Sequence, residues 1–400
     1  MKILQVNCVY KKGSTGKIVF DIHSELVKRG IESVVCYGRG DKIIEPNVYK
    51  TCGELYSKMN NLWSRFTGLM YGGCGLSTNK LIKIIKKENP NVVHLHCING
   101  YFVNIYRLVN WLKKSGIKTI LTLHAEFMYT ANCGHSFECE KWKTGCGKCP
   151  RNKIETKSLI FDRTHSSWQK MKKAFDGFDN LTVVSVSEWL KDRAMQSPML
   201  KDKNHQVVYN GLDTKVFNLV DASDLREIYS PNGEKIIFHA TAHFSDSEGH
   251  NKGGRYIIEL AKRLKDQNVK VLVAGPYDQG LQVPDNLVLL GSVSDQELLA
   301  KYYAMADLTV IASKKETFSM ICAESFCCGT PVVGFKAGAP EQISIKEFST
   351  FVEYGDINAL QQEVQAMLEK KFDKKEISLQ GQKRYSKERM LEEVCNLYGI

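Results

Sequence analysis

Glu316 and Glu324 stand eight positions apart in the segment with the most distinctive pattern of functional residues. The apolar run 308–311 precedes them and Gly329 and Pro331 follow, which predicts a strand, a loop, a helix over 318–328 and a turn. The first N–H groups of a helix lack internal partners and carry partial positive charge, so they favour a phosphate. Carboxylates beside that position accept bonds from hydroxyl groups. We therefore expect a ligand that has both phosphate and hydroxyl groups.

Two other segments have residues suited to holding a phosphate. Lys252 ends a polar loop directly before the helix predicted over 253–266, where a lysine would act as a point charge. Gly13 and Gly16 lie between a predicted strand, 2–7, and a helix that runs to residue 28. This second segment matches neither the P-loop nor the G-x-G-x-x-G pattern, so a plain tight turn explains it equally well.

Three histidines follow or end predicted strands of the first half. His94 and His96 belong to the strand predicted over 92–96, and His124 ends the strand predicted over 118–124. Ligands of doubly wound sheets bind outside the carboxyl ends of the strands. A single histidine in such a place is usually structural, but three on one predicted rim favour a functional role for at least one of them.

Strands and helices alternate twice along the 400 residues, which are too many for one hydrophobic core. The pattern predicts an α/β protein with two doubly wound parallel sheets in tandem and a cleft between them. We expect an N-terminal domain over 1–205, a C-terminal domain over 206–383, and a last helix over 384–400 that packs back toward the first domain. Strands are predicted at 2–7, 33–37, 92–96, 118–124, 181–185, 235–240, 269–274, 287–290, 308–311 and 331–335.

Four of the 13 cysteines gather in a polar insert near 133–150. They are Cys133, Cys139, Cys146 and Cys149, and the last pair forms a C-x-x-C turn. Four thiolates would hold a structural Zn²⁺ and leave it no open position for catalysis. A loop of reduced or incidentally oxidised thiols is the alternative. The odd number and scattered placement of the remaining cysteines fit a reducing compartment.

The net charge of +11 limits the partners. No basic arm or nucleic-acid motif accompanies it, so we expect no nucleic acid, and an anionic membrane or small ligand fits better. Aromatic and basic residues mix at helical spacing in 63–66 and 168–175, as in helices that lie on membranes and also in ordinary half-buried ones. No apolar run has the roughly 20 residues of a membrane span, and the N-terminus lacks a signal peptide. We expect a cytoplasmic protein that contacts the inner face of the plasma membrane peripherally.

These motifs together resemble the retaining glycosyltransferases of family 4, which have the GT-B fold of two Rossmann-like domains. The most specific match is S-x-x-E-T-F-S-x-x-x-x-E-S-x-x-C-G-T-P-V-V at 313–333, and the resemblance runs nearly end to end. It is similar to enzymes of bacterial capsule, O-antigen and exopolysaccharide assembly. Supporting matches lie at 94–96, 122–124, 146–150, 187–190, 210–217, 252–253, 273–276, 291–294, 306–307 and 338–341.

The resemblance implies roles for the residues around the two glutamates. Glu316 would bind hydroxyls of the donor sugar and Glu324 would hold the nucleotide ribose. Lys252 would neutralise the diphosphate leaving group. Backbone amides at three positions would assist it: Thr317, Phe318 and Ser319.

Further roles follow from the resemblance in both halves. Gly13 and Gly16 would let the first loop approach the phosphates, and His124 would touch the sugar. Gly338 and Glu341 would line the donor pocket. The family often has Asp directly after this histidine, whereas Ala125 stands here, and the Arg that commonly precedes the lysine has no counterpart.

The resemblance implies transfer of a hexose-type sugar from a nucleotide sugar, with UDP expected, to a saccharide acceptor that is lipid-linked. It requires no cofactor and no catalytic metal. A nucleotide-sugar epimerase of the same fold and a non-catalytic nucleotide- or carbohydrate-binding protein are the alternatives. A hydrolase would need its two carboxylates to face each other across the substrate, which a spacing of eight in one loop and helix does not favour. An oxidoreductase would need G-x-G-x-x-G.

Overall fold

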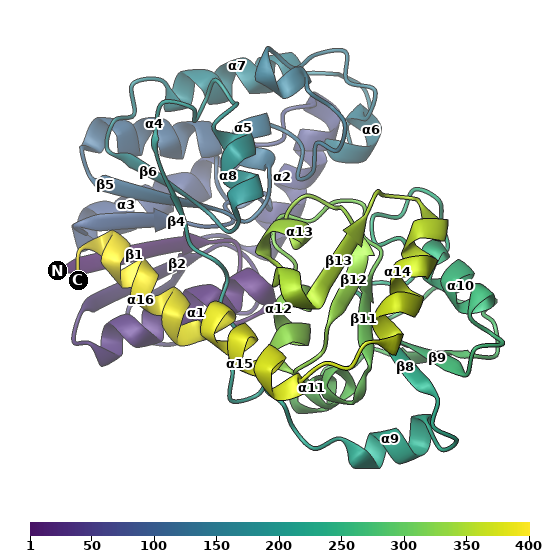
Figure 1. Ribbon diagram of the computed structural model, residues 1–400. Coiled ribbons are helices and arrows are strands. Elements are labelled where there is room, and N and C mark those ends of the chain that lie inside the picture. Colours follow the sequence, from purple (N-terminus) through teal and green to yellow (C-terminus); the bar gives the residue numbers. More distant parts are fainter. The chain divides into compact units, whose positions relative to one another are not determined.

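The computed structural model describes all 400 residues and divides them into two compact units (Figure 1). Unit 1 comprises Met1–Tyr209 with Leu391–Ile400, and unit 2 comprises Asn210–Met390. The predicted boundary after residue 205 falls a few residues earlier, because the strand Asn204–Val207 pairs with Leu181–Ser185 and completes the sheet of unit 1. The last helix changes units within its length, at Met390.

Unit 1 is built on a seven-stranded parallel sheet of order β3-β2-β1-β4-β5-β6-β7. Its strands are β1 Lys2–Asn7, β2 Glu32–Tyr37, β3 Val48–Lys50, β4 Val92–Leu95, β5 Lys118–Leu123, β6 Leu181–Ser185 and β7 Asn204–Val207. Its helices are α1 Gly13–Lys28, α2 Glu54–Thr67, α3 Gly75–Glu88, α4 Ile105–Ser115, α5 Phe127–Thr130, α6 Asn152–Glu155, α7 Thr164–Phe175, α8 Glu188–Ala194 and the end of α16 Lys387–Tyr398.

Unit 2 contains a six-stranded parallel sheet of order β10-β9-β8-β11-β12-β13. Its strands are β8 Lys235–Ala240, β9 Val269–Ala274, β10 Leu287–Gly291, β11 Leu308–Ile311, β12 Val332–Phe335 and β13 Ser349–Val352. Its helices are α9 Ser223–Tyr229, α10 Gly254–Arg263, α11 Gln296–Met305, α12 Met320–Cys327, α13 Pro340–Ile343, α14 Ile357–Glu369 and α15 Lys374–Tyr385.

The central strands of both sheets are mostly apolar and are buried along nearly their whole length, as is typical of parallel sheets that helices cover on both faces. In unit 2, Ile237, Val271, Val310 and Val333 come from four neighbouring strands and are fully buried. The predicted doubly wound sheets are confirmed in both halves. None of the helices combines the length and the apolar character that a membrane span requires.

Each sheet reverses its strand order once, between β1 and β4 in unit 1 and between β8 and β11 in unit 2. Loops after adjacent strands diverge at such a point and leave a crevice for a ligand. In unit 2 these loops are 241–253 and 312–319, which contain Lys252 and Glu316. The topology therefore brings together two candidate residues that lie 64 positions apart in the sequence.

Candidate functional site

The two loops at the switch point of unit 2 are joined by Asn251. Its side-chain amide donates to the carbonyl oxygen of Lys315 at 2.9 Å, and its Oδ1 accepts from the Lys315 amide at 3.1 Å. Its own carbonyl accepts from the Lys314 amide at 2.8 Å. Asn251 thus forms hydrogen bonds with the main chain of the second loop, as a neighbouring strand would, and fixes one loop against the other. Its role depends on a pairing between distant segments, which the sequence does not indicate.

Gly253 makes the close approach of these loops possible. Its φ is +65°, and a Cβ atom there would lie 2.1 Å from the carbonyl oxygen of Ala312. Only glycine combines this backbone conformation with such a short distance to another main chain. Gly253 also precedes the first residue of α10, so Lys252 stands directly before a helix N-terminus, as predicted.

Lys252 and Glu316 form an ion pair, with 2.5 Å between Nζ and Oε1. Their side chains are 26% and 16% exposed, so both charges are largely removed from water. The Glu316 amide donates to the Ala337 carbonyl at 3.0 Å, and its carbonyl accepts from the Ala339 amide, which holds the glutamate against a second loop. A phosphate that binds Lys252 would compete with this carboxylate and release it for hydroxyl groups.

Ser319 begins the helix that follows Glu316. It has a left-handed φ of 99°, and its Oγ accepts a bond from the Cys322 amide at 3.3 Å. The helix therefore starts at Met320, two residues later than predicted, and Ser319 is its capping residue. A non-glycine residue in this conformation costs of the order of 1–3 kcal/mol, so the surrounding packing holds it in place. Thr317 and Phe318 lie in the loop just before this cap.

Glu324 lies about one turn into α12 and has a partner that the sequence did not indicate. The hydroxyl of Tyr303, on α11, donates to Oε2 of Glu324 at 2.9 Å. Burial, together with the neighbouring Glu324 carboxylate, raises the pKa of Tyr303 well above its usual value, so this hydroxyl stays protonated and remains a donor. The bond orients the carboxylate and engages one of its two oxygens.

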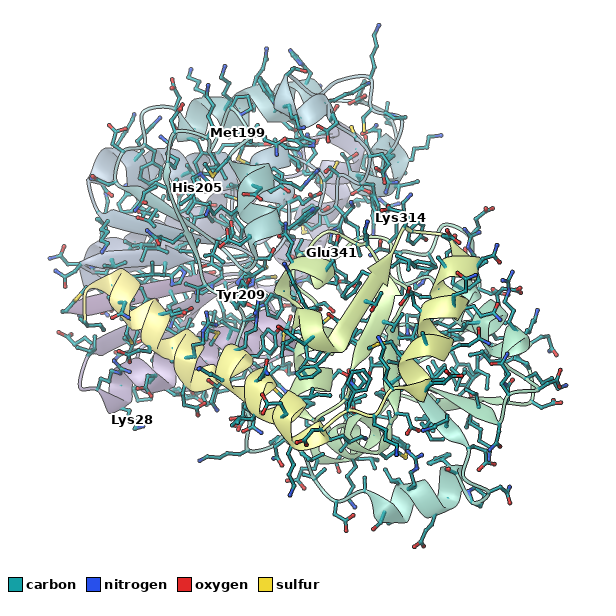
Figure 2. All side chains as sticks on the ribbon, in the orientation of Figure 1. Lys28, Met199, His205, Tyr209, Lys314 and Glu341 are labelled. Carbon is teal, nitrogen blue, oxygen red and sulfur yellow. The ribbon has the colours of Figure 1, made fainter.

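The Glu341 carboxylate accepts hydrogen bonds from the main chain of its own loop. It accepts from the Ala337 amide at 3.0 Å and from the Gly338 amide at 2.9 Å. Gly338 pairs with Glu316 in an isolated bridge, so Glu341 supports the loop against which Glu316 rests. Figure 2 labels Glu341 in the green part of unit 2.

The predicted site residues of unit 1 lie at the switch point of its own sheet. Gly13 is the first residue of α1 and has a φ of +64°. A Cβ on Gly16 would lie 3.2 Å from the Val9 side chain, and the Lys11 amide donates to the Gly16 carbonyl. Both glycines therefore serve a tight turn between β1 and α1.

The three histidines of the rim form a stack. The ring centroids of His94 and His96 are 3.9 Å apart, and those of His96 and His124 are 5.7 Å apart. His94 is fixed by the Tyr398 hydroxyl at 2.6 Å and by the Thr122 hydroxyl at 2.7 Å. The structure thus brings together all three predicted histidines.

Burial keeps this stack uncharged. It lowers the pKa of His94 to about 3 and that of His124 to about 4, and it takes the pKa of His96 well below its usual value. Neutral His124 would give or accept a hydrogen bond with a ligand but would not act as a cationic acid near neutral pH. His96 Nε2 is buried without a partner.

Glu126, two residues after His124, has a structural role. Its carboxylate pairs with Arg193 Nε at 2.7 Å and accepts from the Tyr129 hydroxyl at 2.6 Å and from the Ser136 amide. The side chain is fully buried. Glu126 therefore does not take the place of the Asp that the family often has at the position of Ala125. It anchors the start of the cysteine-containing insert instead.

The four insert cysteines line one small cavity of about 20 Å³ together with Trp142. All are free thiols, and burial raises the pKa of Cys146 to about 12. As the side chains are placed, no group of three or more His, Cys, Asp or Glu residues is arranged to hold a metal ion. Zinc at this cluster stays a prediction for metal analysis.

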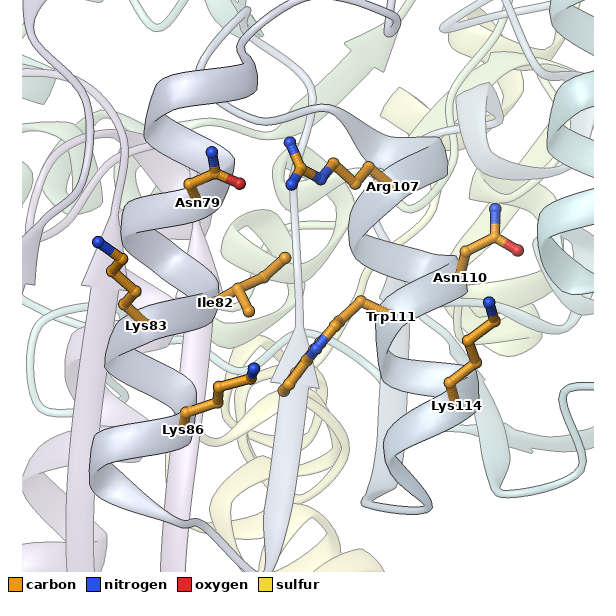
Figure 3. A pocket seen from close by; sticks show the side chains of 8 residues that line it. All are labelled: Asn79, Ile82, Lys83, Lys86, Arg107, Asn110, Trp111 and Lys114. Atoms are coloured by element: carbon orange, nitrogen blue, oxygen red, sulfur yellow. The ribbon is translucent and has the colours of Figure 1, made fainter.

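A groove of about 700 Å³ lies between α3 and α4, away from the predicted site residues (Figure 3). Trp111 and Arg107 point into it from α4, and Ile82 and Lys86 point into it from α3. No acidic side chain is within ion-pair distance of its four cations, which are Lys83, Lys86, Arg107 and Lys114.

Comparisons with known proteins agree with this geometry. The profile of Glycosyltransferase Family 4 matches residues 15–216, and that of Glycosyl transferases group 1 matches 224–384. The chain is 24% identical over its full length to 99% of the "Putative colanic acid biosynthesis glycosyl transferase WcaC" of Escherichia coli K12. It is 22% identical to the "N-acetyl-alpha-D-glucosaminyl L-malate synthase" of Bacillus anthracis, over 88% of this chain and 83% of that protein.

Among solved structures, Anabaena HepE in complex with UDP matches with a TM-score of 0.65 at 14% identity, over the full length of both chains. This likeness and the two parallel sheets identify the fold as GT-B. The profile of Glycosyltransferase Family 4 covers half of the chain. The chain belongs to glycosyltransferase family 4.

Proposed function

We propose that this glycosyltransferase moves a hexose-type sugar from a nucleoside-diphosphate sugar to a hydroxyl of a lipid-linked saccharide, with retention of configuration at the anomeric carbon. The observation that carries the proposal is the Lys252–Glu316 pair beside the N-terminus of α12. It combines a cation and helix amides for phosphate with a carboxylate for sugar hydroxyls. A non-catalytic binding protein would have no need of a half-buried ion pair that a ligand must open.

The proposed chemistry is electrostatic. As the bond between C1 and the diphosphate breaks, positive charge builds on the sugar ring and negative charge on the leaving phosphate. Lys252 and the first amides of α12 stabilise the leaving group, so no catalytic metal is needed. The acceptor hydroxyl attacks on the face that the phosphate leaves, and a phosphate oxygen takes its proton. Glu316 then binds hydroxyls and orients the sugar instead of attacking it.

UDP is the proposed nucleotide because the HepE structure named above contains it. The similarity to a protein described as a colanic acid biosynthesis enzyme supports a role in bacterial surface polysaccharide assembly, such as capsule or O-antigen. Donor and lipid-linked acceptor would then meet at the cytoplasmic, inner face of the plasma membrane. His124, Gly13 and Gly16 are proposed to contribute to the same reaction from unit 1.

The test is a screen of nucleotide sugars for nucleotide release, with and without a polyprenyl-diphosphate-linked saccharide. We expect release from one donor to depend on the acceptor, and the product to retain the α or β configuration of the donor sugar. An epimerase would convert the sugar with no acceptor present. Absence of acceptor-dependent release from every donor would disprove the proposal.

A further inference from the structure

Helix α2 has the reverse of the usual arrangement of a surface helix. Its buried residues are Ser57 and Ser64, whereas its large apolar side chains face outward. Five of them are between 40% and 74% exposed: Leu55, Met59, Leu62, Trp63 and Phe66. A helix in a globular protein normally turns such a stripe toward the core. This stripe is therefore available to cover something outside the chain.

A second segment extends the same apolar surface. Ile154, Leu159, Ile160 and Phe161 are 49% to 63% exposed. The Leu159 amide donates to the carbonyl of Arg65 at 2.8 Å, and a Cβ on Gly68 would lie 2.4 Å from the carbonyl of Phe161. Residues 158–161 thus pack against the end of α2. The nine side chains, here called the apolar face, include more than half of the large hydrophobic residues exposed in the protein.

Unpaired positive charge accompanies the apolar face on the same two segments. Five exposed cations on the same two segments have no acidic partner within ion-pair distance; they are Lys58, Arg65, Lys153, Lys157 and Arg163.

The nearby acids are already engaged. Glu54 pairs with Arg39, and Glu155 pairs with Arg151. Asp162 accepts from the amides of Cys149 and Thr164. The edge of the apolar face therefore presents positive charge that the protein itself does not neutralise.

We propose that the apolar face is a membrane-docking surface, whose large side chains enter the interface of an anionic bilayer while the surrounding cations contact lipid phosphates. Apolar residues on one stripe and unpaired lysine and arginine beside it are the two requirements of an interfacial helix. A soluble polyanion would account for the cations but leave the apolar side chains in water. This inference deepens the proposed function, because a lipid-linked acceptor is presented at such a surface.

The groove between α3 and α4 supplies a control. The groove has four cations without an acidic partner, but it lacks an exposed apolar surface. Its tryptophan is half-buried, and its one aliphatic side chain, Ile82, is 9% exposed. A variant with Lys83, Lys86 and Lys114 changed to Gln removes three charges outside the apolar face. The matched test variant changes Lys58, Arg65 and Lys157 to Gln. Both sets are exposed, so neither change disturbs the core.

The experiment is sedimentation of the full chain with vesicles of phosphatidylglycerol and phosphatidylcholine, compared with vesicles of phosphatidylcholine alone. We expect binding to the anionic vesicles only. Each cation near an anionic leaflet contributes roughly fivefold in affinity, so the Lys58, Arg65 and Lys157 variant loses about 100-fold. The groove variant retains most of the binding.

A second variant tests insertion. Leu55, Met59, Leu62 and Phe66 are changed to Gln, which preserves helix propensity, and Trp63 stays because it packs on Gly72. We expect this variant to lose binding and to keep its melting temperature. The control changes two exposed apolar residues of unit 2, Ile228 and Leu379, to Gln and retains binding.

Three results would overturn the inference. The first is equal binding of the natural protein to anionic and neutral vesicles or to neither, and the second is unchanged binding of the two face variants. The third is an oligomer that the apolar-face variant dissociates without loss of vesicle binding, which would make a second copy the occupant. None of these measurements requires turnover, so failure here is distinct from failure of the transferase proposal.

Discussion

The loops that hold Lys252 and Glu316 differ in construction from the insert that follows His124. In unit 2, each site residue is fixed to a neighbouring strand or loop by main-chain bonds, and Gly253 and Asn251 leave little freedom between them. In unit 1, residues 131–163 contain only two single-turn helices and end in exposed apolar side chains.

The difference indicates which part of the molecule is pre-organised. Catalysis by fixed charges requires groups that do not rearrange during the reaction, and the packed loops of unit 2 meet this requirement. Recognition of a bulky or lipid-bound partner is better served by exposed irregular chain on a rigid sheet. We therefore expect changes in unit 2 to act on the rate and changes in the insert to act on partner choice.

The sharpest test of this contrast is Glu316→Gln. Loss of the carboxylate removes the hydroxyl-binding group beside the phosphate position, and we expect the transfer rate to fall by about 10²–10³-fold. The matched control is Glu353→Gln, an exposed carboxylate of unit 2 whose side chain is 76% exposed and pairs with Lys336. Initial rates of both variants at saturating donor measure the effect. Retained activity in Glu316→Gln would show that the reactive part of the site lies elsewhere.

The next test breaks the packing of the two loops. Gly253→Ala combines a left-handed φ with a clash against the Ala312 carbonyl, and we expect the free energy of unfolding of unit 2 to fall by about 2–4 kcal/mol. Gly280→Ala is the control, since it also has a positive φ but no atom within 4 Å, and it should cost only about 1 kcal/mol. Denaturant melts give both values. Equal effects would mean that the loops separate easily.

The histidine stack makes unit 1 sensitive to acid. Because the folded protein lowers the pKa of His94 and His96 below the unfolded value near 6.5, the unfolded chain binds more protons in acid. Stability is complete above pH 6.5 and falls as the pH drops toward 4, with a slope of about 4 kcal/mol per pH unit from these two histidines and His124, whose pKa is lowered in the same way.

Denaturant melts between pH 7 and pH 4.5 measure this slope. His94→Asn should reduce it by about a third, because two histidines of the stack remain, whereas His165→Gln, at an exposed histidine, should leave it unchanged. The same slope in His94→Asn would assign the acid sensitivity to other groups.

A smaller effect is expected from Tyr303→Phe. The substitution removes one hydrogen bond to Glu324 and keeps the buried ring, so we expect about a tenfold rise in KM for the donor with little change in kcat. Tyr229→Phe is the control, because its hydroxyl meets only another tyrosine, Tyr302, at 3.4 Å. A fall in kcat without a change in KM would separate Glu324 from donor binding.

The insert gives the smallest expected effect on the rate. If Zn²⁺ binds the four cysteines, freshly reduced protein contains one zinc per chain, and changing Cys146 and Cys149 to Ser removes it while the donor site is untouched. Elemental analysis and nucleotide release measure the two properties. The control changes Cys36 and Cys395 of unit 1, which lie outside the insert, to Ser. Protein without stoichiometric zinc would leave the cluster as plain thiols.

The sequence predicted the two sheets and the residues of both switch points, because buried parallel strands are continuous apolar runs and their ends carry the polar residues. It missed β3 and β13, which are edge strands of three and four residues. It assigned Lys252 and Glu316 separate roles and did not predict their ion pair, which depends on the close approach of two loops that Asn251 and Gly253 hold together.

Helix α2 shows a different limit. Leu55, Met59, Leu62 and Phe66 stand at helical spacing and share one side of α2. Periodicity does not tell whether that side is covered, because the same pattern serves a core and an interface. The structure resolves this by burying Ser57 and Ser64 instead.

The return of α16 to unit 1 has a consequence for biosynthesis. The last turn of this helix supplies the Tyr398 hydroxyl that fixes His94, and Glu392 pairs with Arg29. On the ribosome, residue 209 emerges about 180 residues before this segment, a delay of roughly 10–35 s at ordinary elongation rates. During that interval the nascent sheet of unit 1 lacks its final helix. The histidine stack therefore reaches its native hydrogen bonding only when translation is almost finished.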